Sequence, residues 1–224
     1  IHSNGIFQLE VPLETTHKDY QVWYDSGVCS ADPYAFWPTF GELDSHLFTQ
    51  GVHYKIYDKM GARVTRHQGI KGVKFCVWAP NARRVSLVGD FNSWNGMTNP
   101  MRSLGACGVW ELFVPGLSEG AHYKFEIKTQ EGSIHLKADP YALYSQMRPQ
   151  TASIVANVES YTWCDQEWMS QRRLKAGNLS QPMSIYEVHL GSWKKRNGHF
   201  VDYRTLAKEL AEYCVDMGFT HVEL

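Results

Sequence analysis

The chain has 224 residues, of which 43% are hydrophobic, and a formal net charge of −1 with its ten histidines neutral. This length suits one large or two small domains, and the apolar content lies well above that of disordered proteins. A nearly neutral balance leaves no basic field for nucleic acid, and no apolar run is long enough to cross a membrane. We therefore expect neither a nucleic-acid partner nor a membrane partner.

The ends and the cysteines of the chain indicate whether it is cut and in which compartment it folds. The chain begins at Ile1 rather than Met and stops at Leu224 inside an apolar run, so we expect both ends to be cut. The first residues lack the basic start and apolar stretch of a secretory signal. The five cysteines are scattered and odd in number, which favours reduced thiols, small buried hydrophobes, in a cytoplasmic protein.

The first 66 residues contain short, interrupted patterns. Alternation over residues 6–11 and 20–24 predicts a β-hairpin. A turn-rich connector follows over residues 32–44, and a short helix is predicted from His53 to Met60, ended by Gly61.

From Gly72 to about Val158 the pattern becomes one of short strands separated by turns. Strands are predicted over residues 73–79, 85–89, 110–114, 123–127 and 134–136. The clearest period-two signal is the alternation of Tyr123, Phe125 and Ile127 with Lys124 and its neighbours. Strands at this spacing predict an antiparallel β-sandwich of immunoglobulin-like size, and hence a mainly β fold class.

The last forty residues predict a βαβ unit. Residues 184–190 form the first expected strand, and Asp202 is placed as the N-cap of a helix. Gly218 sits where a C-cap glycine belongs, before a second strand over residues 220–224. The expected buried face of the helix comprises Leu206, Ala207, Leu210, Ala211, Cys214 and Met217. Two parallel strands and one helix do not close a fold, so we expect the rest of this domain beyond Leu224.

Several motifs together resemble a known family. The run from Gly72 to Asn95 (GVKFCVWAPNARRVSLVGDFNSWN) is similar to the start of a family 48 carbohydrate-binding module. YKFEI at residues 123–127 and KADPY at 137–141 resemble its later strands. DPYAF at 32–36 and GELD at 41–44 resemble the linker of long-form bacterial glycogen branching enzymes. IYEVHLGSW at 185–193 and GFTHVEL at 218–224 resemble the first two barrel strands of those enzymes.

The resemblance implies a domain plan for the chain. Residues 1–31 would be the end of an extra N-terminal β domain, and 32–66 a linker with short helices. Residues 67–160 would be the carbohydrate-binding β-sandwich and 161–183 a second linker. Residues 184–224 would begin a truncated (β/α)8 barrel of the α-amylase superfamily, glycoside hydrolase family 13.

The resemblance also implies an activity for the parent protein. Branching enzymes cut an α-1,4-glucan and transfer the segment to form an α-1,6 branch, by a retaining double displacement that uses two carboxylates about 5 Å apart. Those acids lie at the ends of later barrel strands, so no catalytic residue is expected in this chain, which alone would be inactive. No metal or cofactor is implied, and the expected partners are α-glucans such as glycogen and amylose, together with the rest of the barrel.

Two alternatives remain open from the residues. The chain could begin a related debranching or trehalose-forming enzyme, although DPY, GELD and HLGSW favour branching. It could instead be a free-standing glucan-binding or regulatory module, against which the βαβ tail argues.

Two residues are the candidate glucan contacts. Trp94 follows the turn at Gly89–Asn92, and its indole could stack on the apolar face of a pyranose ring. Packing between sandwich and barrel is the equally weighted alternative. Lys124 matches a position that helps bind glucan in relatives of the module. Where those relatives place a second tryptophan this chain has Ile134, so weak binding is expected.

Other chemistry-bearing residues are expected to be structural. Glu187 and Glu223 are interpreted as hydrogen-bonded barrel residues rather than a catalytic pair, and His189 and His221 as too few for a metal site. Trp78 and Trp110 are expected to pack in the sheets, and Trp193 to pack in a loop or contact substrate. Asn92 and Asn95 should support their turn, and the basic runs 83–84 and 194–196 should be solvated.

Overall fold

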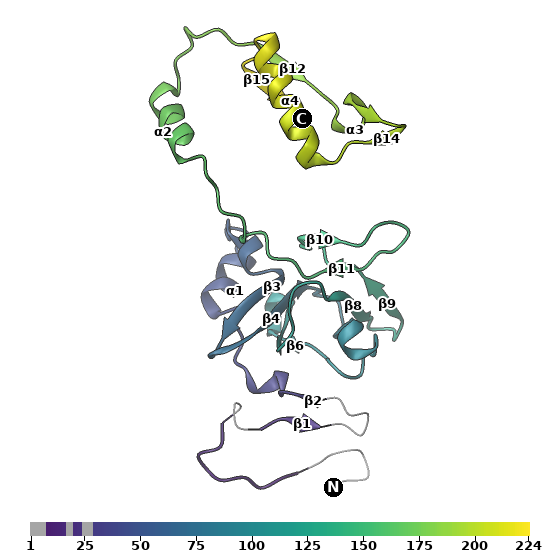
Figure 1. The fold of residues 1–224 in the computed structure, drawn as a ribbon. Helices are drawn as coiled ribbons and strands as arrows, with labels where there is room; N and C mark the ends of the chain where they lie inside the picture. Colours follow the sequence, from purple (N-terminus) through teal and green to yellow (C-terminus); the bar gives the residue numbers. More distant parts are fainter. Residues whose placement is uncertain (1–7, 17–19, 24–28) are drawn as a thin grey trace. The chain divides into compact units, whose positions relative to one another are not determined.

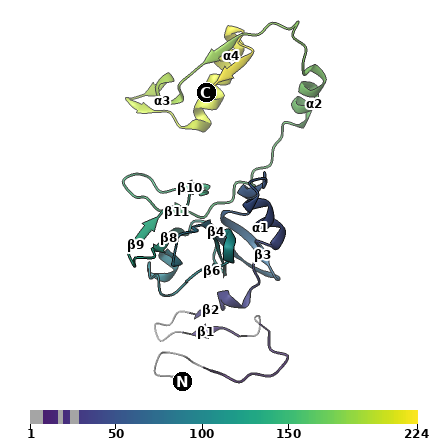
Figure 2. The same ribbon diagram turned by 180° about the vertical axis from the view of Figure 1, so that it is seen from behind.

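The computed structural model describes residues 8–16, 20–23 and 29–224, and the chain divides into two compact units, Ile1–Tyr161 and Thr162–Leu224. Each unit is shown in Figures 1 and 2. Among the described residues, no helix has the length and apolar character needed to cross a membrane.

Two antiparallel sheets form the centre of the first unit. The first has the strand order β3-β4-β7-β6, with bounds Gly61–His67, Ile70–Trp78, Val109–Pro115 and Arg102–Ser103. The second has the order β10-β11-β8-β5, with β9 also paired to β8. Its bounds are β10 Tyr144–Ser145, β11 Ser153–Ile154, β8 His122–Lys128, β5 Arg84–Gly89 and β9 Ile134–Lys137. This confirms the predicted mainly β fold with antiparallel pairing.

The core lies between the two sheets. Alternate residues of β8 point inward, so that Tyr123 and Phe125 are fully buried. Phe75 of β4 meets Tyr123 with ring centroids 4.9 Å apart at a steep angle, an arrangement that aromatic pairs favour. Val85 and Leu87 of β5 complete the layer. The even-numbered residues of β8 therefore face outward, which decides where the candidate site can lie.

The outer face of the first sheet is covered by the segment that precedes it. Helix α1 (Glu42–Thr49) lies beside β3, on the side of the unit away from β9 (Figures 1 and 2). Phe40, Met60 and Cys76 form a second buried cluster beneath it. The 3-10 helices of this unit are η1 Pro33–Ala35, η2 Ile56–Asp58, η3 Asp90–Asn92 and η4 Gly105–Cys107.

Three details before residue 67 differ from expectation. Val22–Trp23 (β1) pairs with Cys29–Ser30 (β2), and residues 8–11 form no strand; Ile6, Phe7 and Tyr24 lie outside the described residues. The helix expected over residues 53–60 is reduced to η2. The α-helix of this segment is instead α1, where the Asp44 carboxylate accepts the Gly41 N–H at 3.1 Å. Gly61 begins β3, whose seven pairs with β4 place residues 61–66 in the sandwich sheet, although the resemblance implies a linker over 32–66.

The second unit contains the predicted βαβ arrangement. Strands β12 (Ile185–Glu187) and β15 (His221–Glu223) are parallel, with α4 (Tyr203–Met217) between them in sequence. The remaining elements are α2 Gln166–Lys175, α3 Leu190–Trp193, β13 Lys195–Arg196 and β14 His199–Phe200.

Local signals set both ends of α4, as the sequence predicts. The Asp202 carboxylate accepts the Arg204 and Thr205 N–H groups at 3.1 Å each, and Gly218 adopts φ +79° at the C-cap. Leu206, Leu210 and Cys214 are buried. The prediction that Ala207, Ala211 and Met217 share this buried face is wrong, because these residues are exposed. Only the stripe formed by Leu206, Leu210 and Cys214 packs against the two strands.

Candidate functional site

The turn that carries Trp94 is held by asparagine side chains. Asn92 Oδ1 accepts the Gly89 N–H at 2.9 Å, and Asn92 Nδ2 donates to the carbonyl of Leu87 at 2.9 Å and to Asn99 Oδ1 at 2.8 Å. Asn95 Oδ1 accepts the Met97 N–H at 2.9 Å. Asn92 and Asn95 therefore support the turn as expected, and they fix the backbone directly before and after the indole.

Trp94 itself occupies an unusual backbone conformation. Ser93 and Trp94 adopt φ values of +53° and +58°, a region that side chains with a Cβ rarely occupy. The Trp94 N–H donates to the carbonyl of Gly89 at 2.9 Å. The side chain is 39% exposed, and its Nε1 donates to Asp90 Oδ1 at 3.1 Å. The indole is thus presented at the surface rather than buried between elements of the first unit.

Lys124 lies on the outward-facing side of β8. It pairs in register with Val88 of β5, and its Nζ donates to Thr151 Oγ1 at 2.7 Å. His122 lies two residues away on the same face, and its Nδ1 is 2.6 Å from Asp90 Oδ2. Because Asp90 contacts both the Trp94 indole and the His122 ring, it connects the Trp94 turn to the face of β8 that carries Lys124.

The same face continues over β9 with apolar side chains. Ile134 pairs with Lys128, and Leu136 pairs with Glu126, so both side chains share the outward face of β8. They are 55% and 54% exposed. At the position where the sequence lacks a second tryptophan, the face therefore still offers an exposed aliphatic surface.

Asp90, His122 and Thr151 are site residues that the sequence reasoning missed. His122 could have been found from the period-two pattern, since it is two residues before Lys124. No sequence pattern points to Thr151, and in the sequence Asp90 is only one residue of the turn at Gly89–Asn92. Only the register between β5 and β8 brings Asp90 to His122.

The other tryptophans of the sandwich have packing contacts. Trp110 packs against the core, and its Nε1 donates to the carbonyl of Ala79 at 3.0 Å. Trp78 is 56% exposed, with its ring in edge contact with Phe48 of α1 at a centroid distance of 6.1 Å. Trp110 packs inside the sandwich as expected, whereas Trp78 is more exposed than expected and contacts α1 at the outer surface.

The acidic and imidazole side chains of β12 and β15 form no recognisable site. Glu187 and Glu223 are cross-strand neighbours, both exposed. His189 Nδ1 lies 3.0 Å from Ser192 Oγ, and His221 Nδ1 lies 2.8 Å from Thr220 Oγ1. Within residues 8–16, 20–23 and 29–224, no three His, Cys, Asp or Glu side chains gather as metal ligands would.

Trp193 packs in its loop. Its Nε1 donates to the hydroxyl of Tyr186 at 3.0 Å, and its ring lies edge-on to Tyr213 at a centroid distance of 5.9 Å. These contacts support the packing interpretation of the two that the sequence allows.

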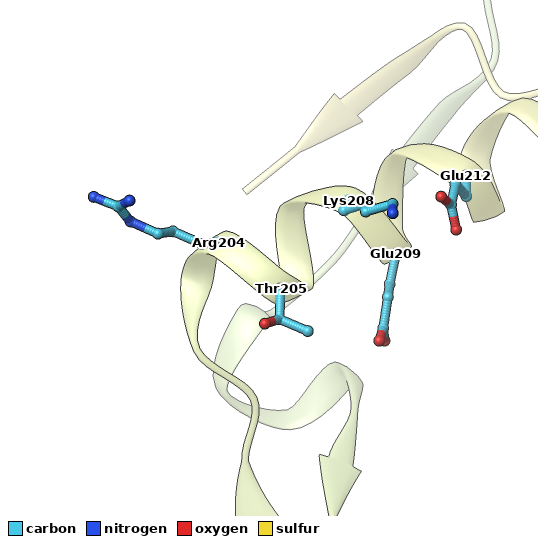
Figure 3. Close-up of a pocket in the computed structure, with 5 residues that line it drawn as sticks. All are labelled: Arg204, Thr205, Lys208, Glu209 and Glu212. Carbon is cyan, nitrogen blue, oxygen red and sulfur yellow. The ribbon is translucent and has the colours of Figure 1, made fainter.

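An open hollow on α4 is lined by charged side chains (Figure 3): Arg204, Thr205, Lys208, Glu209 and Glu212. Glu209 forms ion pairs with Lys194, at 2.6 Å, and with Arg196. Residues four apart on a helix are neighbours, so Lys208 and Glu212 also share a side of α4. This arrangement is a network of surface ion pairs in an open hollow.

One residue of the basic runs, Arg84, is less solvated than expected. Arg84 Nη2 lies 2.5 Å from Glu126 Oε1, and both side chains are largely buried. The register of β5 with β8 places this pair on one face, so Arg84 belongs to the sheet rather than to a solvated loop. Arg83 and residues 194–196 are exposed as expected, and Lys194 and Arg196 pair with Glu209 at the surface.

Comparisons with known proteins relate the chain to carbohydrate-active families. Residues 59–142 match the model of carbohydrate-binding module 48, described as the isoamylase N-terminal domain. The chain is 60% identical over its whole length to a 1,4-alpha-glucan branching enzyme of Protochlamydia amoebophila, and 52% identical to one of Chlamydia caviae. It spans 31% of the length of each.

Solved structures give weaker likenesses. A pullulanase from Bacillus acidopullulyticus superposes with a TM-score of 0.43 at 20% identity, covering 62% of this chain and 16% of that one. A pullulanase from Klebsiella pneumoniae complexed with maltotriose gives a TM-score of 0.42 at 24% identity, covering 60% of this chain and 13% of that one.

The sandwich and the sequence relationships agree with the predicted resemblance. The chain is thus similar along its full length to bacterial 1,4-alpha-glucan branching enzymes, of which it spans about a third, and its residues 59–142 match the model of carbohydrate-binding module 48.

Proposed function

We propose that this chain is the glucan-binding portion of a 1,4-α-glucan branching enzyme, and that it binds α-glucan on the outward face of β8. The single observation that carries the proposal is the surface presentation of Trp94, connected through Asp90 to the face of Lys124. The apolar C–H face of a pyranose would stack on the indole, while the ammonium of Lys124 would donate to sugar hydroxyls.

The exposed aliphatic side chains of Ile134 and Leu136 would extend the contact. They supply apolar area without the stacking preference of a second indole, so binding should be weak for a single module. Weak binding suits a module that holds a long polymer, because several contacts along one glucan chain raise the effective affinity.

The whole protein would transfer segments of an α-1,4-glucan into α-1,6 branches by the retaining mechanism that the resemblance implies. We propose that the βαβ unit of residues 185–223 begins the barrel of that enzyme and that the catalytic carboxylates lie on strands outside this chain. The free thiols of Cys76, Cys107, Cys164 and Cys214 support a cytoplasmic location.

Titration of the 224-residue chain with maltoheptaose by calorimetry tests the binding site. Trp94→Ala should weaken binding about thirtyfold or more, because truncating an aromatic hot spot costs about 2 kcal/mol or more. Lys124→Ala should weaken it less, since a surface amine is readily replaced by water. Trp37→Ala is the matched control, because its indole is also exposed, at 76%, but lies before the sandwich. Equal affinities in Trp94→Ala and the unchanged chain would refute the proposed face.

Reading the gene past the codon for Leu224 tests the enzyme proposal. An open frame of several hundred residues, with an Asp nucleophile and a Glu acid on later barrel strands, is the expected result. The product of that frame should lower the iodine absorbance of amylose. A stop codon soon after Leu224 would leave the glucan-binding module as the function of the chain.

A further inference from the structure

We infer that Asp90 and His122 form a positioning pair that fixes the orientation of the Trp94 indole for glucan binding. The inference rests on the proposed function, in which Trp94 stacks on the sugar, and it assigns to that site two residues beyond the stacking indole and Lys124.

The backbone of Trp94 shows that its side chain is needed at this position. A φ of +58° costs a residue with a Cβ roughly 1–2 kcal/mol, whereas glycine adopts this conformation freely. A turn residue without a further role would more easily be Gly or Asn. The strained position therefore directs the indole to a defined place on the surface.

Burial alone does not hold the indole there. Because the residue is 39% exposed, the orientation of its indole depends on the hydrogen bond from Nε1 to Asp90 Oδ1 at 3.1 Å. Asp90 is itself on the short helix η3, next to the turn. A carboxylate on such a segment needs a second anchor if it is to fix another side chain.

His122 supplies that anchor from the sheet. Its Nδ1 lies 2.6 Å from Asp90 Oδ2, close enough for a hydrogen bond to the carboxylate. The two oxygens of one carboxylate thus join the indole to β8, two residues from Lys124. The pair keeps the stacking ring and the amine on a common rigid support, so that binding does not need to immobilise the indole first.

The expected effect follows from this preorganisation. Immobilising a mobile side chain on binding lowers affinity by about two- to tenfold. Asp90→Ala should therefore weaken maltoheptaose binding by that factor, less than Trp94→Ala does. Asp90→Asn should restore most of the affinity, because its amide oxygen can still accept the indole N–H.

The experiment uses the 224-residue chain labelled with 5-fluorotryptophan, with the Trp94 resonance assigned by its loss in Trp94→Phe. Asp90→Ala should shift and broaden the Trp94 ¹⁹F resonance and weaken maltoheptaose binding in calorimetry, while the amide spectrum of β8 stays in place. Asp90→Asn should move both readouts back toward the unchanged chain. Asp58→Ala, the loss of another exposed aspartate of the same unit, should change neither.

A double-mutant cycle tests the pair as a unit. Asp90→Ala combined with His122→Ala should bind no more weakly than Asp90→Ala alone, because both act on the indole through one connection. Additive losses would overturn the pair. The positioning role would be refuted if Trp94→Ala binds weakly while Asp90→Ala keeps its affinity and leaves the Trp94 resonance in place. The proposed function would still stand in that case. Unchanged binding in Trp94→Ala would instead refute the proposed function, and the positioning role with it.

Discussion

Glu111 is a buried carboxylate that attaches the segment before the sandwich to the first sheet. Its side chain belongs to β7, and the residue is 4% exposed. The carboxylate accepts the Thr39 N–H at 2.8 and 3.1 Å, the Thr39 hydroxyl at 2.5 Å and the Phe40 N–H at 3.2 Å. We predict that Glu111→Leu, which removes these acceptors at similar volume, strongly destabilises the first unit.

Two structural responses set the magnitude of the loss. If residues 36–41 stay in place, two backbone donors are buried without a partner, which costs about 2–6 kcal/mol at 1–3 kcal/mol each. If the segment detaches, the donors regain water but Phe36 and Phe40, 2% and 5% exposed, leave the core. That exposure costs about 3–6 kcal/mol at 1.5–3 kcal/mol for each ring. Either response predicts a loss of at least about 2 kcal/mol.

The neighbouring Lys74 adds to the stability that Glu111→Leu should lose. Burial lowers its pKa, and Cys76 and Glu111 act in the opposite direction. Without the Glu111 carboxylate the pKa of Lys74 should fall further, because a buried ammonium loses a nearby opposite charge. Glu111→Gln keeps one acceptor oxygen and should cost less than Glu111→Leu.

Urea unfolding followed by the NMR cross-peaks of β4 and β7 measures the effect in the first unit alone. Hydrogen exchange at residues 36–41 then separates the two responses, since only detachment raises exchange there. Glu119→Gln, at an exposed loop position, is the control and should change stability by less than about 0.5 kcal/mol. A loss below about 1 kcal/mol in Glu111→Leu would refute the reasoning that this carboxylate anchors the segment.

Three further predictions test other parts of the fold. Burial alone would raise the pKa of Asp44, but hydrogen bonds from His53, Lys59 and the Gly41 N–H outweigh it and lower the pKa below 3.8. The stabilisation is therefore present above pH 3.8 and lost as the pH falls through the lower folded-state pKa, so Asp44→Asn should show a flatter loss of stability in acid titrations. Leu210→Ala should destabilise α4 by about 2–5 kcal/mol, measured by amide exchange, whereas Val215→Ala, exposed at 80%, should have little effect. Gly61→Ala should lower the melting temperature more than Gly120→Ala. Both glycines have positive φ, but a Cβ at residue 61 would lie 2.8 Å from the Tyr141 carbonyl oxygen, whereas at residue 120 it meets open space.

The elements that the sequence predicted are those whose signals are local. The alternation of Tyr123, Lys124 and Phe125 requires only a strand with one face toward a core, and β8 has that form. Asp202 and Gly218 mark the ends of α4 because caps act on backbone groups within one turn. The family motifs also predicted the sandwich from local signals, since a run such as residues 72–95 contains a strand, a second strand and a turn.

The elements that the sequence missed depend on distant partners. Helix α1 has little buried surface of its own, and it lies where it does because Glu111, some seventy residues later, accepts the N–H groups just before it. The same is true of β3, which belongs to the sheet because it pairs with β4.

By itself the sequence determined the antiparallel strands, the βαβ order, the family resemblance and the two candidate contacts, Trp94 and Lys124. Only the tertiary structure decided that the alternate residues of β4 and β7, Lys74 and Glu111 among them, are buried under the preceding segment. It alone joined Asp90 to His122 across 32 residues. A period-two pattern predicts which residues of a strand share a face. The segment that covers this face, and the distant side chains that contact it, depend on strand register and on remote parts of the chain.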